Sequence, residues 1–197
     1  LARLGGKPVG VIANDPHFYA GSMDAEGALK VKRFVDLCDT FHLPVVTLVD
    51  EPGFMIGSAS ERSGTIRFGV EAISRVVMSK IPWCTVLVRK AYGVAAAAHF
   101  APKAHVLSWP SAESGALPIE GGVAVAFRRE IAEAPDPDAK RAELEEALSK
   151  GRSPFPRAES FGVHDLIDPR ETRSRLCRWV NRVWPLLSEQ VPTRAPF

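Results

Sequence analysis

The stretch RKAYGVAAAAHF, residues 89–100, contains the residues whose types and spacing best support chemistry. Two cations, a tyrosine and a glycine precede a run of alanines, which are strong helix formers with small side chains. A helix that begins at Gly93 presents unpaired backbone N–H groups at its N-terminus, where they and the helix dipole stabilise negative charge. This is an oxyanion hole, in which one donor contributes about 2.7–4 kcal/mol in other enzymes. Any strand-to-helix turn supplies such groups, so a purely structural turn is the alternative.

The sequence gives less support for chemistry by side chains. It contains no G-x-G-x-x-G, P-loop, C-x-x-C or H-E-x-x-H pattern, so dinucleotide, nucleoside triphosphate and metal sites are not expected. His99 could act as a base beside the alanines, but a lone histidine on a short helix is more often packed or hydrogen-bonded, and we favour that interpretation. The serines near Glu61 lack the context of a nucleophile elbow, which disfavours serine hydrolysis.

The elements that position this stretch alternate between strands and helices. Apolar runs predict buried strands over residues 9–13, 45–50 and 83–88. One helix is expected from the N-cap Asp24 to about Phe41, and a second is expected over the apolar stripe Ile66, Val70, Ile73, Val76 and Val77. This βαβαβ order implies a parallel sheet with sites at the carboxyl ends of its strands. The candidate site loops are therefore Asn14–Met23, Glu51–Glu61 and Arg89–Val94.

Smaller elements are expected in the second half of the chain. A short strand within residues 104–109 is followed by a Gly- and Pro-rich loop and a helix near Val123–Ile131. Residues 134–151 predict a polar surface helix that ends at Gly151. Asp168 and the proline after it predict the start of the last helix, which ends near Trp184. The arginines of that helix are expected to form an exposed face rather than an anion site.

The composition is that of one ordinary soluble α/β domain, with 197 residues, 46% hydrophobic and 24% charged. A net charge of +2 is too small to indicate a nucleic-acid or membrane partner. The scattered Cys38, Cys84 and Cys177 are expected to be core thiols in a reducing compartment, and no signal or membrane-length apolar run is present, which favours the cytoplasm. The chain begins with Leu1 rather than Met, so we expect a fragment of a longer protein.

Three stretches resemble the carboxyl-terminal lobe of the biotin-dependent acyl-CoA carboxyltransferase family. They are VIANDPHFYAGSMDAEGALKVKRFVDLCDTFHLPVVTLVDEPGFMIG, ERSGTIRFGVEAISRVVMSKIPWCTVLVRKAYGVA and ESFGVHDLIDPRETRSRL, which cover most of Val9–Leu176. The resemblance implies a crotonase-type fold, a spiral of ββα units with a mainly parallel sheet. It also implies that residues 1–197 form the biotin-side lobe of a two-lobed subunit, whose amino-terminal lobe has no counterpart here. The isolated lobe is then expected to be inactive.

The family reaction moves a carboxyl group from N-carboxybiotin to the α-carbon of an acyl-CoA. By resemblance, the backbone amides of Val94 and Ala95 stabilise the biotin oxyanion, and the preceding Tyr92 and Gly93 belong to the same turn. The expected cofactor is biotin, carried on a partner. The expected partners are an acyl-CoA substrate, the biotin carboxyl carrier, the biotin carboxylase component, the missing lobe and further copies of the subunit.

Three further residues complete the expected substrate site. In the turn EPGF, Gly53 allows a tight bend and Phe54 walls the site beside the biotin turn, with a plain structural turn as the alternative. Ala97 stands where some members of the family carry a larger residue that selects the acyl chain, so the acyl specificity is open.

The resemblance departs from the family at Val94, where a second glycine is usual. If this position requires a positive φ, a valine would be strained and the hole distorted. Three alternatives therefore accompany the transferase hypothesis. One is a biotin-dependent decarboxylase, which shares these motifs. Another is a non-catalytic assembly subunit, for which Val94 is the motive. The last is a crotonase-type hydratase or isomerase, disfavoured because no pair of acidic side chains stands out.

Overall fold

The computed structural model describes residues 1–116 and 119–189, and in this part of the chain the strands form one seven-stranded sheet. The strands are β1 (Ala2–Leu4), β2 (Lys7–Ala13), β3 (Val45–Glu51), β4 (Trp83–Tyr92), β5 (His105–Ser108), β6 (Glu113–Gly115) and β7 (Asp165–Leu166). Their order is β1-β2-β3-β4-β5-β7, with β6 beside the second half of β4. β1 and β2 are antiparallel and the other pairs are parallel. The predicted mainly parallel sheet is confirmed.

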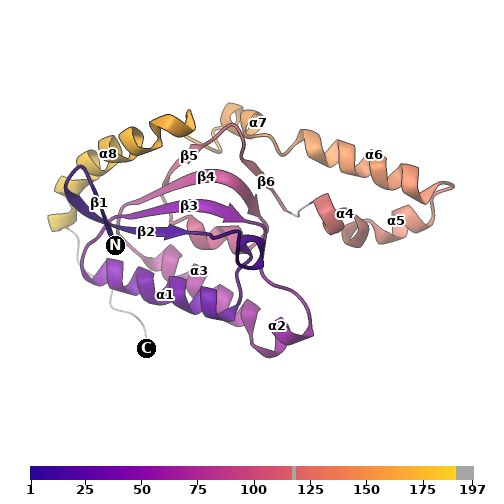
Figure 1. The fold of residues 1–197 in the computed structure, drawn as a ribbon, viewed down its shortest axis with the longest axis horizontal. Coiled ribbons are helices and arrows are strands. Elements are labelled where there is room, and N and C mark those ends of the chain that lie inside the picture. Colours follow the sequence, from indigo (N-terminus) through magenta and orange to yellow (C-terminus); the bar gives the residue numbers. More distant parts are fainter. Residues whose placement is uncertain (117–118, 190–197) are drawn as a thin grey trace.

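Helices cover both faces of this sheet (Figure 1). The α-helices are α1 (Ala25–Thr40), α2 (Ser58–Arg62), α3 (Thr65–Met78), α4 (Ile119–Ala126), α5 (Arg128–Ala132), α6 (Pro137–Lys150), α7 (Pro154–Glu159) and α8 (Thr172–Val183). Short 3-10 helices are η1 (Tyr19–Gly21), η2 (Ala95–His99), η3 (Pro169–Glu171) and η4 (Trp184–Glu189). α1 and α3 lie against one face, α8 lies on the other, and α4, α5 and α6 form an arm that projects from the sheet.

The core consists of two apolar layers because successive side chains of a strand point to opposite faces. In β3, Val45 and Val49 pack with the layer under α1 and α3, whereas Val46 packs with the layer under α8. Burial on both faces explains why the strands are continuous apolar runs in the sequence. Cys38 and Cys84 lie buried in these layers, where burial raises their thiol pKa values to about 11 and about 12.

The predicted starts of α1 and of the last helix are confirmed by their caps. The Asp24 carboxylate accepts a hydrogen bond of 2.7 Å from the N–H of Gly27. Asp168 likewise accepts one of 2.8 Å from the N–H of Arg170, but the first turn is the 3-10 helix η3, so α8 begins only at Thr172. Within residues 1–116 and 119–189, no helix has the length and apolar content needed to cross a bilayer.

Two sequence-based predictions about helices were wrong in part. Of the expected apolar stripe of α3, Val76 is buried and Ile73 packs against the core, but Ile66, Val70 and Val77 are exposed. The other buried residues of α3 are Thr65, Gly69, Ala72 and Arg75. The reason is that the Phe54 ring lies against Gly69, where a Cβ atom would have no room. The single helix expected near Val123–Ile131 is divided at Phe127 into α4 and α5.

Candidate active site

Parallel pairing brings the ends of β2, β3 and β4 to one edge of the sheet. Ala13 at the end of β2 pairs with Leu48 of β3. Further along β3, Glu51 pairs with Ala91 of β4 after a register shift. The chain therefore leaves these three strands at the same edge, and the prediction that EPGF and the turn after β4 emerge together is confirmed. The third candidate loop is shorter than expected, because β4 continues to Tyr92 and pairs with β6.

The turn after β4 changes the chain direction at a single glycine. Gly93 has a φ of 63°, and its N–H donates a hydrogen bond of 3.0 Å to the carbonyl oxygen of Gly115 in β6. Val94 follows with φ −69° and ψ −30°, in the right-handed helical region that any L-residue adopts. The positive φ thus falls on Gly93 alone, and Val94 occupies its position without backbone strain.

The backbone of this turn presents two free donors. Among the described residues, no hydrogen bond is found from the N–H of Val94 or of Ala95, whereas the N–H of Ala97 donates to the Val94 carbonyl at 3.0 Å. The Val94 side chain is 67% exposed and that of Ala95 is 1% exposed. The run of alanines forms the five-residue 3-10 helix η2 rather than a longer α-helix, and Ala97 is half-buried in it. Two adjacent N–H groups at such a turn can bind an oxygen that carries negative charge.

Tyr92, the residue before the turn, is held in place by hydrogen bonds of its side chain. Its buried hydroxyl donates a hydrogen bond of 2.8 Å to Glu113 Oε2 and accepts one of 3.0 Å from Arg152 Nη1. The Arg152 guanidinium also lies 5.0 Å from the centre of the Tyr92 ring. Burial, together with the hydrogen bond to Glu113, raises the pKa of the Tyr92 phenol to about 12. Because the side chain is buried, only the backbone of Tyr92 is left to contact a ligand, and such a contact stays a prediction.

The EPGF turn packs beside the first candidate loop, Asn14–Met23. Gly53 has a φ of 138°, and its carbonyl accepts a hydrogen bond of 3.1 Å from the N–H of Met23. Phe54 forms an isolated parallel bridge with Met23, and its ring is half-buried against α3. This packing explains the ring structurally, and its role as a wall of the substrate site stays a prediction.

Sequence reasoning missed Glu51, which is fully buried at the centre of the site edge. Its Oε1 accepts hydrogen bonds from the N–H groups of Met23 at 3.2 Å and Gly53 at 3.1 Å, and its Oε2 accepts one from Asn14 Nδ2 at 3.0 Å. The sequence did contain a signal for Glu51, which is a carboxylate at the end of an apolar strand. A charge that is buried there requires several hydrogen-bond partners.

His99 is packed and hydrogen-bonded, as predicted. It is 1% exposed, and its carbonyl oxygen accepts hydrogen bonds from Thr85 Oγ1 at 2.7 Å, Trp83 Nε1 at 2.9 Å and Thr47 Oγ1 at 3.1 Å. Its Nε2 lies 3.4 Å from Glu51 Oε2. Among the described side chains, its Nδ1 has no hydrogen-bond partner. His99 therefore anchors the end of η2 rather than facing solvent as a base.

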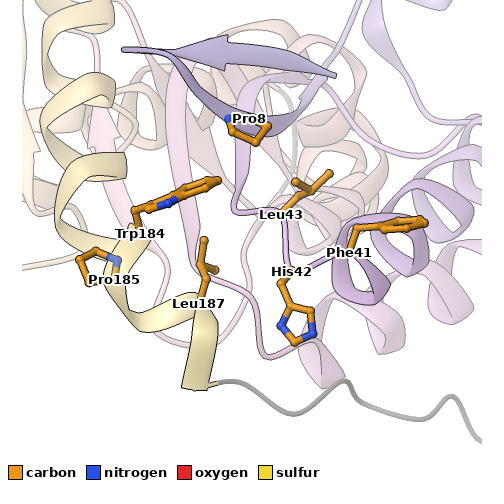
Figure 2. A pocket seen from close by; sticks show the side chains of 7 residues that line it. All are labelled: Pro8, Phe41, His42, Leu43, Trp184, Pro185 and Leu187. Atoms are coloured by element: carbon orange, nitrogen blue, oxygen red, sulfur yellow. The ribbon is translucent and has the colours of Figure 1, made fainter.

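Two hollows adjoin the sheet at opposite ends. One of about 1150 Å³ runs beside β2 and α1 at the site edge, and its lining includes Asn14, Met23 and His99. Figure 2 shows the other, of about 730 Å³, where α8 and η4 approach the start of β2 and the loop before β3. Its lining is mostly apolar and consists of Pro8, Phe41, His42, Leu43, Trp184, Pro185 and Leu187. Of the polar site residues described above, Asn14 and His99 line the first hollow, and none lines the second.

Metal ligands do not cluster in the described part of the chain. No group of three or more His, Cys, Asp and Glu side chains could hold a metal ion there. Arg178 and Arg182 of α8 are exposed, as was expected for that face of the helix. Arg175 is half-buried and pairs with Asp165 at 2.7 Å and with Glu171 at 3.0 Å.

Comparison with known proteins gives consistent matches along the chain. A model of the carboxyl transferase domain matches residues 1–193. The chain is 40% identical over 180 residues to the methylmalonyl-CoA carboxyltransferase 12S subunit of Propionibacterium freudenreichii subsp. shermanii. It is 38% identical over 181 residues to the carboxyltransferase subunit of the Haloferax mediterranei propionyl-CoA carboxylase. Each match covers 89% of this chain but only 34% and 35% of the relatives, so the chain spans about a third of their length.

Solved structures agree in fold. The crystal structure of the transcarboxylase 12S hexamer with methylmalonyl-coenzyme A bound has a TM-score of 0.84 and 36% identity, and the match covers 100% of this chain and 38% of that one. The geranyl-CoA carboxylase β subunit of P. aeruginosa has the same TM-score at 23% identity, which supports the fold alone. The crotonase-type fold implied by the resemblance is confirmed. The chain belongs to the carboxyl transferase domain family.

Proposed function

We propose that this chain is the biotin-side lobe of an acyl-CoA carboxyltransferase, which moves a carboxyl group from N-carboxybiotin to the α-carbon of an acyl-CoA. The lobe binds the ureido oxygen of biotin through the backbone N–H groups of Val94 and Ala95. The rest of the longer protein supplies most of the acyl-CoA site, and partner components carry and carboxylate the biotin. The family membership and the free donors at the turn support this assignment.

The single observation that carries the proposal is the conformation of the turn. Gly93 takes the positive φ, Val94 remains helical, and the next two N–H groups have no acceptor within the described residues. Two donors fixed in this way lower the energy of an oxygen that becomes negative during reaction, and they need no reorganisation to do so. The assembly-subunit hypothesis depended on strain at Val94, and φ −69° removes that motive.

The residues around the turn fit a biotin ring. Carboxybiotin bound here would supply CO2 by cleavage of its N–C bond and a nitrogen base for the α-proton of the acyl-CoA, which leaves the α-carbon free to bond to CO2. The Val94 and Ala95 amides donate hydrogen bonds to the ureido oxygen as this charge develops. The small side chains of η2, which begins at Ala95, let a ring approach these amides closely.

A decarboxylase is the second candidate. The chain is 36% identical over 180 residues to the methylmalonyl-CoA decarboxylase subunit alpha of Propionigenium modestum. The same two amides would then act in the opposite direction, because a catalyst stabilises one transition state for both directions. The direction of net transfer with methylmalonyl-CoA and with propionyl-CoA distinguishes the two.

The test removes one N–H while preserving the backbone. Val94 has φ −69°, close to the value of about −65° that proline imposes, and its side chain is exposed. Val94→Pro therefore deletes a donor while keeping φ at position 94, and the preceding Gly93 has no Cβ atom to clash with the proline ring. Val94→Ala is the matched control that keeps the N–H. Ala95→Pro is a poorer choice because it would place a helical residue, Val94, directly before a proline.

The assay is carboxyl transfer to acetyl- and propionyl-CoA by the full-length protein with its biotin-bearing component. Val94→Pro should reduce the rate about a hundredfold to a thousandfold, whereas Val94→Ala should retain the wild-type rate. Circular dichroism establishes that both variants are folded. A folded Val94→Pro protein with normal turnover would exclude the Val94 amide as a donor.

A further inference from the structure

Glu51 and His99 form a buried polar pair that the proposed chemistry does not use. His99 Nε2 lies 3.4 Å from Glu51 Oε2, and the side chains are 1% and 0% exposed. A buried ion pair costs more in desolvation than a well-packed apolar pair of similar volume. Packing alone therefore gives no reason for a carboxylate and an imidazole at this place.

The Glu51 carboxylate joins the three loops at the site edge. Its two oxygens accept hydrogen bonds from the N–H groups of Met23 and Gly53 and from the side-chain amide of Asn14. Its Oε2 also lies within hydrogen-bonding distance of His99 Nε2. An ionised carboxylate only accepts hydrogen bonds, so the Met23, Gly53 and Asn14 groups donate to it, and His99 joins them in the tautomer that carries its proton on Nε2. One side chain thereby fixes the position of the loop after β2, the EPGF turn and η2 relative to one another.

His99 transmits this constraint to the turn through a short helix. Its carbonyl oxygen accepts three side-chain hydrogen bonds from β3 and β4, so its backbone and side chain are both anchored. η2 has only five residues, and a 3-10 helix rises about 2 Å per residue. A displacement of His99 therefore moves Ala95, at the other end of the same rigid segment.

We infer that Glu51 and His99 are positioning residues, which fix the positions of the Val94 and Ala95 N–H groups relative to the EPGF turn. The catalytic meaning of this inference rests on the proposed function. Donors in such a site must be aimed at the reacting oxygen, and a misplacement of about 1 Å can cost about a hundredfold in rate. The role of the pair is thus to maintain the geometry of a site that neither side chain contacts.

The test compares three variants with a matched control in the full-length protein. Glu51→Gln and His99→Gln keep the approximate size of each side chain, and the double variant removes both. Asp36→Asn is the control, because it weakens a different ion pair, Arg75–Asp36, which links α1 to α3. The measurements are kcat and KM for the acyl-CoA, and hydrogen exchange of the η2 amides Ala97 and Phe100, which are hydrogen-bonded within that segment at 3.0 and 3.3 Å.

Each single variant should lower kcat about tenfold to a hundredfold, with the acyl-CoA KM unchanged, and should accelerate exchange at both amides. The double variant should be no worse than the poorer single variant, because the two residues act as one unit. The control should change neither measurement. If Glu51→Gln does not fold, His99→Gln carries the test, since the other three donors to Glu51 remain.

Turnover and exchange equal to those of Asp36→Asn would overturn the inference. Its failure is distinguishable from failure of the proposed function. A wild-type protein that transfers no carboxyl group to or from any acyl-CoA tested would reject the proposed function. In that case exchange at Ala97 and Phe100 still decides the positioning role, with faster exchange in the variants supporting it and unchanged exchange rejecting it.

Discussion

The N–H of Gly93 donates a hydrogen bond of 3.0 Å to the carbonyl oxygen of Gly115, which joins the turn after β4 to β6. β4 is thus paired with β5 along its first half and with β6 along its second. The turn is held by sheet hydrogen bonding on one side and by the anchored end of η2 on the other. Its conformation is therefore a property of the fold rather than of a bound ligand.

Gly93→Ala should damage both stability and activity. The residue has a φ of 63°, and an alanine Cβ would lie 3.4 Å from the Ala116 carbonyl oxygen. The left-handed conformation alone costs about 1–2 kcal/mol, measurable by urea unfolding. Gly6→Ala is the control, because Gly6 has a φ of 85° with no atom near its Cβ position. Equal rates of carboxyl transfer in the two variants would contradict the proposed role of the turn.

Glu51→Ala should be strongly destabilising. The change removes the carboxylate that interacts with two buried groups, of Met23 and His99, and with two part-buried ones, of Asn14 and Gly53. Breaking a buried charged network costs about 3–5 kcal/mol. Glu133→Ala is the control, because that carboxylate pairs with Arg129 on the exposed surface, where ion pairs contribute little. The measurement is the free energy of unfolding in urea at neutral pH. A loss of unfolding free energy no larger than that of the control would show that water replaces the carboxylate as the acceptor for these donors.

Alkaline pH should destabilise the fold through Tyr92. The phenol pKa is about 12 in the folded protein, against about 10 in an unfolded chain. The folded state therefore keeps its proton as pH rises above 10 while the unfolded state loses it, so this contribution to stability is complete below pH 10 and lost towards pH 12. Tyr92→Phe should flatten the fall of the unfolding free energy between these values. An identical slope in the two proteins would place the phenol in contact with water.

The exposed apolar face of α3 should be covered in the assembled protein. It consists of Ile66, Val70 and Val77. Val70→Asp should change the unfolding free energy of the chain by no more than about 0.5 kcal/mol, because the side chain is exposed, but should weaken assembly of the full-length protein in sedimentation experiments. Val125→Asp, at an exposed valine of α4, is the control. Normal assembly of Val70→Asp would contradict this prediction. A stable hexamer of this chain alone would instead contradict the view that it is one lobe of a two-lobed subunit.

Local signals predicted the element boundaries well. The caps at Asp24 and Asp168 are formed by hydrogen bonds to residues two or three positions away, so the sequence alone contains them. The order of buried strands likewise fixed the edge at which the candidate loops meet. The family resemblance then supplied the fold and the reaction, which no spacing of residues could provide.

Non-local contacts account for what the sequence did not predict. The face of α3 that is buried depends on Phe54, whose ring lies against Gly69 from another loop. The pair of Glu51 and His99 joins residues 48 positions apart, and each looks unremarkable in its own segment. The hydrogen bond of Gly93 to Gly115 of β6, next to Val94, joins residues 22 positions apart, and β6 had not been predicted.

The conformation of the turn determines which substitutions of Val94 are compatible with the proposed function. Under the proposed function, position 94 contributes only a backbone hydrogen, while its side chain is 67% exposed and free to vary. Any residue with a hydrogen on its backbone nitrogen can make this contact, and proline is the residue that lacks one. A search for invariant side chains would therefore pass over the position, and the informative pattern across relatives is the absence of proline.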